Sequence, residues 1–450
     1  MVFWKTEKQK GNTGLNVYHR RRRSRRCYLS SMLVALPFLL LLAELPTNTA
    51  NNTTNKLGIG VYTDTPQSPP YQLQLDAALN LTAAQGFVTL YLCAWRTDTA
   101  SCMNESTTTI DADSQQQLLA AYQRNLTVVA RIGNPRVVNH HADRNQDTGL
   151  RNVTSYKHLA QAYARVVASL ALPPLTSPPL YVTIGNEFNA CNEWRCTSAM
   201  TSAMTSAMTI KGDNSEANMT EQDMASQVAG FYRDVGQALK PIRAQRKGRM
   251  QYAHGAIANW NTSPCSCNTG TPLGPGRFGL SFIDLMLQAV PTLYHEVDWL
   301  SSHSYPFSQS GWDNPKCKRG LLYYRNESNI IAAAIAAASP AGTHAGAHAG
   351  AHAAVLPLPV IITETGWNLK RNHTELNRAN WTVLAYKQLW LPDAQVLGVT
   401  PFLLSGAFWN DKGGWPWMRY TTNGTKNGTK NVLTPTPVFR AVQTLQRTGL

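Results

Sequence analysis

The feature that most constrains the fold of this chain is an alternation of apolar, strand-like runs with helical stretches along residues 57–450. The runs are rich in β-branched and aromatic residues, as buried strands are. They cover residues 57–63, 87–95, 126–132, 180–186, 250–256, 297–305, 358–364 and 397–409. The helical stretches cover residues 72–86, 114–124, 155–172, 221–246, 280–293, 329–338, 375–391 and 438–446. Eight strand–helix repeats predict a single-domain α/β fold, a TIM (β/α)8 barrel, because an open doubly wound sheet rarely repeats eight times.

Charge is concentrated at the N-terminus. Residues 1–26 hold nine Lys and Arg and one acid, Glu7, so they contribute +8 of the net +15. The remaining +7 (15 minus 8) is spread over more than 400 residues. The domain is therefore only mildly basic, and we expect no nucleic acid among its partners.

An apolar segment follows the basic arm. Its strict apolar run, residues 32–43, has the length of a signal-peptide core, whereas the wider segment 28–45 is long enough for a short anchor. Positive charge before such a segment marks its cytosolic side. Two alternatives remain open, a removed signal peptide and a type II signal anchor. The predicted domains are a basic arm at 1–27, the signal or anchor segment at 28–45, a linker at 46–56, and the barrel domain at 57–450.

The rest of the chain suits the secretory pathway. Its sequons begin at Asn51, Asn52, Asn80, Asn104, Asn125, Asn152, Asn218, Asn261, Asn326, Asn372, Asn380, Asn423 and Asn427. Thirteen sequons after a targeting segment predict a glycosylated domain, either secreted or membrane-anchored with its bulk in the lumen or outside the cell. Membrane contact is expected only through the N-terminal segment.

Seven cysteines lie beyond the apolar segment, where oxidising conditions favour disulfides. Cys93 with Cys102, and Cys191 with Cys196, are plausible local pairs. Cys317 is free to join either of two remaining cysteines, and the odd count leaves one thiol over. These two are Cys265 and Cys267. Their close spacing lacks the second ligand pair that a zinc site needs, so no metal is predicted.

Two low-complexity inserts interrupt the domain, at residues 197–210 and 341–354. The second carries His344, His348 and His352 at a period of four. On a helix these imidazoles would share one face and could bind a metal. Interspersed glycines oppose a helix, however, and tandem expansion of the sequence explains the period without a function.

Polar and aromatic side chains gather at the ends of the predicted strands. In a β/α barrel, active sites lie at the carboxyl ends of the strands, so these side chains are expected to share one face. Two of the strands, residues 181–187 (YVTIGNE) and 360–364 (VIITE), end on glutamates that are 177 positions apart (364 minus 187), which fits strands 4 and 7. Two carboxylates across one cleft are what glycoside hydrolysis requires. The strand-end residues are Arg131, Asn186, Glu187, His303, Tyr305, Glu364 and Trp409.

These motifs resemble the clan A glycoside hydrolases, whose marks are an Asn-Glu pair closing strand 4 and a Glu closing strand 7. The segments Ile59-Gly60-Val61, Ile184-Gly185-Asn186-Glu187 and Thr363-Glu364-Thr365-Gly366-Trp367 look most like the family 17 β-1,3-glucanases. His303-Ser304-Tyr305 and Trp409 look more like family 5. Asn368 stands where family 17 often has proline. The resemblance covers most of residues 57–450 as a strand framework.

The resemblance implies a retaining mechanism in which Glu187 is the acid/base and Glu364 the nucleophile. It places Asn186 near the sugar 2-hydroxyl and Tyr305 in a hydrogen bond to Glu364. Arg131 would favour ionised Glu364, although a solvated or core-capping role is an equal alternative. For His303 the alternatives are a contact to substrate or a neighbour and a purely structural imidazole.

Indole rings are the expected platforms for sugars, since their flat faces suit the apolar C–H groups of a sugar ring. Trp367 and Trp409 are the two tryptophans assigned to substrate binding. Eight of the twelve tryptophans follow predicted strand ends, which favours a glycan cleft over packing by chance. The eight are Trp95, Trp194, Trp260, Trp312, Trp367, Trp409, Trp415 and Trp417.

The sequence therefore predicts a retaining glycoside hydrolase that uses no cofactor and cleaves β-1,3-glucan or a related β-glucan or mannan. Three alternatives stay open. A transglycosylase would use the same two glutamates. A non-catalytic glycan-binding protein on an inactive barrel would not use these glutamates for a reaction. A membrane-tethered structural glycoprotein would have no need of either glutamate.

Overall fold

The chain divides into two units, Met1–Asn52 and Thr53–Leu450. The computed structural model describes only parts of the second unit, namely residues 55–62, 68–92, 109–133, 156–189, 221–258, 279–306, 313–314, 319–338, 357–367, 369, 374–405, 414–425 and 428–448. The basic arm, the apolar segment, the seven further cysteines and both low-complexity inserts lie outside these residues. Among the helices described, none combines the length and apolar character needed to cross a membrane.

Strands and helices alternate along most of the described chain. The first half contains β1 (Gly58–Val61), α1 (Tyr71–Thr82), β2 (Phe87–Leu92), α2 (Ala112–Gln123), β3 (Thr127–Ile132), α3 (Tyr156–Ser169), β4 (Leu180–Ile184), α5 (Glu221–Arg246) and β5 (Met250–His254). The second half contains α6 (Gly279–Ala289), η3 (Leu293–Glu296), β6 (Leu300–His303), β7 (Asp313–Asn314), β8 (Arg319–Gly320), α7 (Tyr323–Ala338), β9 (Val360–Glu364), α8 (Glu375–Ala385), η4 (Tyr386–Trp390), β10 (Val396–Val399), β11 (Met418–Thr425), β12 (Gly428–Pro435) and α10 (Pro437–Arg447).

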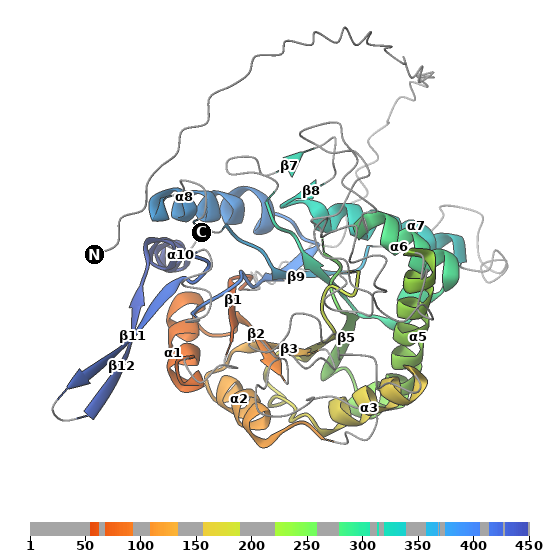
Figure 1. The fold of residues 1–450 in the computed structure, drawn as a ribbon, viewed down its shortest axis with the longest axis horizontal. Helices are drawn as coiled ribbons and strands as arrows, with labels where there is room; N and C mark the ends of the chain where they lie inside the picture. The colour runs from red at the N-terminus through yellow and green to blue at the C-terminus, as the bar shows by residue number, and fades with distance from the viewer. Residues whose placement is uncertain are drawn as a thin grey trace, which may run out of the picture. The chain divides into compact units, whose positions relative to one another are not determined.

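The strands that alternate with helices are parallel. They form a five-stranded sheet, in the order β1-β2-β3-β4-β5, and a three-stranded sheet, in the order β10-β9-β6. The long helices lie around the outside of these strands (Figure 1). This confirms the predicted α/β fold with parallel strands, although the described strands make two sheets and not one closed hydrogen-bonded ladder.

A few hydrogen bonds outside the regular strand ladders join the two sheets along both edges. Leu57 and Val399 form an isolated parallel bridge between β1 and β10. At the other edge, the Asp298 N–H donates to the carbonyl of Tyr252 over 2.8 Å. The Asp298 carboxylate in turn accepts from the Tyr252 N–H over 2.8 Å. A side chain therefore takes a position that a strand backbone would occupy in a closed ladder.

One apolar cluster shows that both sheets curve around a common interior. Each member comes from, or directly adjoins, a different parallel strand, as in the side-chain layers that fill a β/α barrel. The cluster consists of Phe87, Val129, Tyr181, Ala253, Trp299 and Ile361, with Leu397 packed against it. A larger cluster joins the outer faces of the strands to the helices.

The predicted final strand, residues 397–409, is too long, since β10 ends at Val399. Pro401 has no N–H to donate, so the regular ladder ends before it, although the Phe402 N–H still donates to the Thr365 carbonyl over 2.9 Å. The antiparallel pair β11–β12 was not predicted. It leads into α10, which packs between α1 and α8 (Figure 1).

Candidate active site

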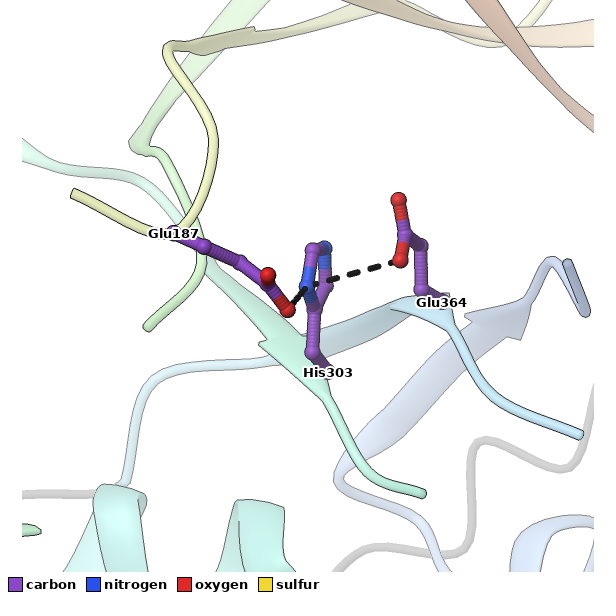
Figure 2. Close-up of side chains that lie close together, drawn as sticks. All are labelled: Glu187, His303 and Glu364. Carbon is purple, nitrogen blue, oxygen red and sulfur yellow. Dashed lines mark hydrogen bonds and ion pairs between the residues drawn. The ribbon is translucent and has the colours of Figure 1, made fainter. Parts of the chain in front are cut away.

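The carboxyl ends of the parallel strands bring five of the predicted side chains together. Arg131 lies in β3, Glu187 follows β4, His303 ends β6, Tyr305 follows it, and Glu364 ends β9. Because parallel strands point the same way, their ends share one side of the fold. Figure 2 shows the side chains of Glu187 and Glu364 approaching the His303 ring from opposite sides.

The His303 imidazole lies between the two carboxylates. Its Nδ1 is 2.8 Å from Oε1 of Glu187 and 3.6 Å from Oε2 of Glu364. One oxygen from each glutamate and a ring nitrogen of His303 all lie within 4.8 Å of one another. The side chains are 16%, 10% and 1% exposed for Glu187, Glu364 and His303 respectively, so the glutamates retain some access to a ligand while the ring is enclosed.

Glu364 is held in its ionised form. Burial alone would raise its pKa, but the electrostatic interactions with His303 and Arg131 and the hydrogen bonds from Arg131 and Tyr305 hold that pKa below its ordinary value. Arg131 forms an ion pair with Oε1, and the Tyr305 hydroxyl donates to Oε2 over 2.8 Å. Arg131 is itself buried and lies over the Tyr91 ring, 4.8 Å from its centre. The Arg131 guanidinium is therefore paired with the Glu364 carboxylate inside the protein and is not solvated.

The turn after β4 aims Glu187 into the site. Gly185 has a φ of +81° and Glu187 a φ of +34°, a left-handed conformation that side chains seldom adopt. A Cβ on Gly185 would lie 2.2 Å from the ring of Phe188, so only glycine fits beside that buried phenyl group. The Glu187 N–H donates to the carbonyl of Ala256 over 2.9 Å, which fastens the turn to the segment after β5. Backbone strain of this kind is often found at functional sites.

Aromatic rings frame Tyr305 and Glu364. The Trp415 ring packs edge-on against Tyr305, with centres 5.5 Å apart, and against Phe402 at 5.9 Å. Phe402 in turn packs against Tyr91 at 6.5 Å. Trp415 is half-buried, so part of its indole remains open.

Arg378 in α8 fixes the segment that carries Trp415. Its side chain is 1% exposed and pairs with Glu375 over 2.6 Å. It also donates to the carbonyls of Gly414, Trp415 and Pro416. A buried guanidinium with this set of acceptors holds the backbone of the segment, and therefore the indole, against Tyr305.

The other residues predicted for the site are Trp367, Trp409 and Asn186. Trp367 is 5% exposed and packs against Trp381, with ring centres 6.1 Å apart, which leaves little of its indole for a sugar. Trp409 lies outside the described residues. Asn186, next to Glu187, is half-buried. Tyr91, Phe402 and Arg378 carry no motif that marks them in the sequence, and Trp415 is there only one of eight tryptophans that follow predicted strand ends.

Glu187, His303 and Glu364 together resemble a metal-ligand set in their spacing. The positive charge of Arg131 next to Glu364 opposes a dication there, because the two cations would share one carboxylate. The donor set therefore fits proton transfer and charge stabilisation better than metal binding.

No protein-family model and no curated protein sequence matches the chain. Solved structures of glycoside hydrolases align with it at low identity. A family 39 glycoside hydrolase from Bacteroides cellulosilyticus WH2 aligns at 12% identity and a TM-score of 0.47, over 88% of this chain and 64% of that enzyme. A GH5_18 enzyme from Bifidobacterium longum, solved with Manβ1-4GlcNAc, aligns at 11% and 0.45, over 88% and 78%. A GH128 endo-β-1,3-glucanase from Pseudomonas viridiflava aligns at 13% and 0.35, over 79% and 88%.

Replacing Arg131 by methionine is expected to raise the pKa of Glu364, because a positive charge that offsets burial is lost. A carboxyl with a depressed folded-state pKa adds stability above its unfolded pKa, and that stability is lost as the pH falls through the folded pKa. R131M should therefore be less stable than the wild type at neutral pH, and the difference in unfolding free energy between the two proteins should narrow on acidification as Glu364 becomes protonated in both. Carbon-13 NMR of labelled glutamate carboxyls measures the midpoint.

The matched control is R131K, which keeps a positive charge while losing the guanidinium geometry. Its Glu364 midpoint should lie between those of the wild type and R131M. An unchanged midpoint in R131M would show that Arg131 does not determine the ionisation of Glu364.

Proposed function

We propose that this chain is a retaining glycoside hydrolase that cleaves β-glycosidic bonds of a polysaccharide. The observation that carries the proposal is the pairing of Glu187 and Glu364, with oxygens of the two carboxylates within 4.8 Å of each other. Retaining enzymes hold their carboxyl groups about 5–5.5 Å apart, whereas inverting enzymes need about 6.5–9.5 Å to admit a water. The short separation favours a direct attack on the sugar.

In the first step, Glu364 attacks the anomeric carbon while Glu187 donates a proton to the departing oxygen. The bond from carbon to the leaving oxygen breaks, and an ester between Glu364 and the sugar forms. The ionised state of Glu364 supplies the electron pair. Tyr305 and Arg131 keep this carboxylate oriented before the attack.

In the second step, Glu187 takes a proton from water, and the resulting hydroxide attacks the same carbon. The ester breaks, Glu364 is regenerated, and the sugar leaves with its original configuration. His303, with Nδ1 2.8 Å from Glu187, is suited to orient that carboxyl group through both proton transfers. We assign Asn186 to the sugar 2-hydroxyl.

Within this class we propose β-1,3-glucan as the substrate, on the strength of the family 17-like segments around Glu187 and Glu364. Related β-glucans or mannan are the alternatives that the family 5-like residues suggest. Trp415, half-buried beside Tyr305, is a candidate sugar platform within the described residues, in addition to Trp409. If a sugar hydroxyl replaced water in the second step, the same residues would carry out transglycosylation.

We also propose that the domain lies in the secretory pathway, secreted or attached by its N-terminal segment. The sequon asparagines Asn80, Asn125 and Asn380 are exposed, as glycan attachment requires, while Asn326 is half-buried. Glycans at the three exposed sites would point away from the core.

The experiment is to express the full chain in a secretory host and supply β-1,3-, β-1,4- and mixed-linkage glucans and mannan. Release of reducing ends is expected, fastest from β-1,3-glucan. Elongated oligosaccharides would indicate transglycosylation. Binding to a glucan without any bond cleavage would favour the glycan-binding alternative and overturn the proposed hydrolysis.

A further inference from the structure

A second carboxyl group is buried behind the candidate active site. Glu327 lies in α7 and is 4% exposed. It lines a small cavity between α7, α6 and the seam of β5 and β6, together with Ile283, Ile331 and Trp299. The cavity offers about 20 Å³ to the centres of water molecules. This is room for roughly one water, far less than an ionised carboxylate needs for solvation.

The titratable groups that face Glu327 are also uncharged at neutral pH. They are Tyr294 in η3, Tyr323 in α7 and His254 at the end of β5. Burial lowers the pKa of His254 to about 3 and raises the pKa of both tyrosines. None of these three groups supplies the positive charge that a buried carboxylate would require.

A chain of hydrogen bonds runs from α7 through β6 and back to Glu327. The Tyr324 N–H donates to the Ser304 hydroxyl over 3.2 Å, and the hydroxyls of Ser304 and Ser302 are 3.0 Å apart. The Ser302 hydroxyl donates to Oε2 of Glu327. Since Ser304 accepts from Tyr324, it can donate to Ser302, and the protons of both serine hydroxyls then have an acceptor.

His303 stands between the two serines of this chain. Successive side chains of a strand point to opposite faces, so Ser302 and Ser304 face α7 while His303 faces the glutamates. The Ser304 carbonyl also accepts from the Thr365 hydroxyl over 2.6 Å, which ties the end of β6 to the residue after Glu364. A displacement of the serines would therefore move the imidazole.

We propose that Glu327 is a positioning residue which, as a neutral carboxylic acid, anchors the end of β6 and thereby holds His303 between Glu187 and Glu364. The catalytic importance of this position of His303 rests on the proposed function. The link from Glu327 through Ser302 to His303 does not depend on it. Burial raises the pKa of Glu327 to about 8, and the Ser302 hydrogen bond opposes this rise. Deprotonation above that pH places a poorly solvated charge beside β6, which displaces the end of β6 and with it the His303 ring.

The test compares the wild type with E327Q, whose amide oxygen still accepts from Ser302 and which stays neutral at every pH. A folded pKa raised from 4.5 to about 8 adds stability that is complete below the unfolded pKa and is lost as the pH rises through the folded pKa. Between these values, unfolding of the wild type releases one more proton than unfolding of E327Q. The unfolding constant of the wild type divided by that of E327Q should therefore rise about tenfold for each pH unit between the two pKa values.

The positioning role is read from the ring nitrogens of His303 by nitrogen-15 NMR, assigned with H303Q. In the wild type their shifts should show a step with a midpoint near pH 8, and in E327Q this step should be absent. Identical His303 titrations in the two proteins would overturn the positioning role. Equal slopes of the unfolding constants would overturn the neutral state of Glu327.

S302A supplies a second variant should E327Q fold poorly. It keeps the carboxyl group but removes the hydroxyl that links Glu327 to β6, so the His303 step near pH 8 should shrink or disappear. A His303 step of unchanged size in S302A would count against the Ser302 link. These measurements need no substrate, so their failure is distinct from a failure of the proposed hydrolysis.

Discussion

Glycoside hydrolysis by the E364Q variant is expected to fall by roughly 10⁴-fold or more in kcat, the scale of loss when a nucleophile is removed from a catalytic unit. A glutamine has the shape of Glu364 but cannot form the ester with the sugar. Its amide oxygen can still accept a hydrogen bond from Arg131 or Tyr305, so the fold should persist. The measurements are kcat on the best substrate and thermal unfolding of both proteins.

The E364A variant tests the role of Glu364 through its stability and through rescue by azide. It leaves Arg131, whose side chain is 7% exposed, as a buried charge without this carboxylate, a loss of roughly 3–5 kcal/mol in unfolding free energy. It also opens space in which azide can attack the anomeric carbon. Because only one displacement then occurs, the glycosyl azide should have the inverted configuration. A retained azide product would assign the nucleophile elsewhere.

Removal of Glu187 is expected to give a loss that depends on the leaving group. E187A should slow hydrolysis of polysaccharide by about 10²–10⁴-fold, because the departing sugar oxygen needs a proton. Aryl glycosides with acidic phenol leaving groups need little protonation, so their first step should be nearly unaffected. The comparison of kcat/KM between the two substrate types measures this difference.

Azide again distinguishes the roles. In E187A the covalent sugar on Glu364 still forms, and azide attacks it in place of the water that Glu187 would activate. Two displacements give an azide product with retained configuration. E187Q is the matched control, since it keeps the size of the side chain next to His303. An equal loss on both substrate types would contradict the acid/base role.

The two glutamates differ because their surroundings differ. Glu364 has a guanidinium, a phenol and an imidazole within reach, all of which favour its charge. Glu187 is the more exposed of the two and contacts the shared imidazole. Surroundings that favour the charged form suit Glu364 to be the nucleophile of the pair.

Most of the parallel strands could be predicted from the sequence because each is a short apolar run between polar segments. The predicted run 126–132 corresponds to β3 at Thr127–Ile132, and the run 358–364 to β9 at Val360–Glu364. The end of β10 was misplaced because aromatic residues continue beyond Pro401 although the ladder does not. The β11–β12 pair was missed although Asn-Gly dipeptides, strong hairpin signals, occur at 423–424 and 427–428.

In the site, the strand-end positions of Glu187 and Glu364 and the hydrogen bond from Tyr305 to Glu364 were expected from the sequence, whereas Arg131 and His303 were each left with two alternatives. Arg131 could equally have capped the core, and only the folded structure brings it, from 233 positions away, to Glu364. Arg378 and Glu327 act from outer helices, so no motif near the glutamates marks them. Trp367 was expected to bind substrate, yet its ring is packed against Trp381.

The central claim is that Glu364 forms a covalent bond to the sugar. A 2-deoxy-2-fluoro β-1,3-linked glucobioside with a dinitrophenyl leaving group slows the second step more than the first, so the intermediate accumulates. Peptide mass spectrometry of the trapped full chain should find one fluoroglycosyl group, on Glu364, with none on E364Q. An adduct on Glu187, or turnover to an inverted product with no adduct, would contradict the account.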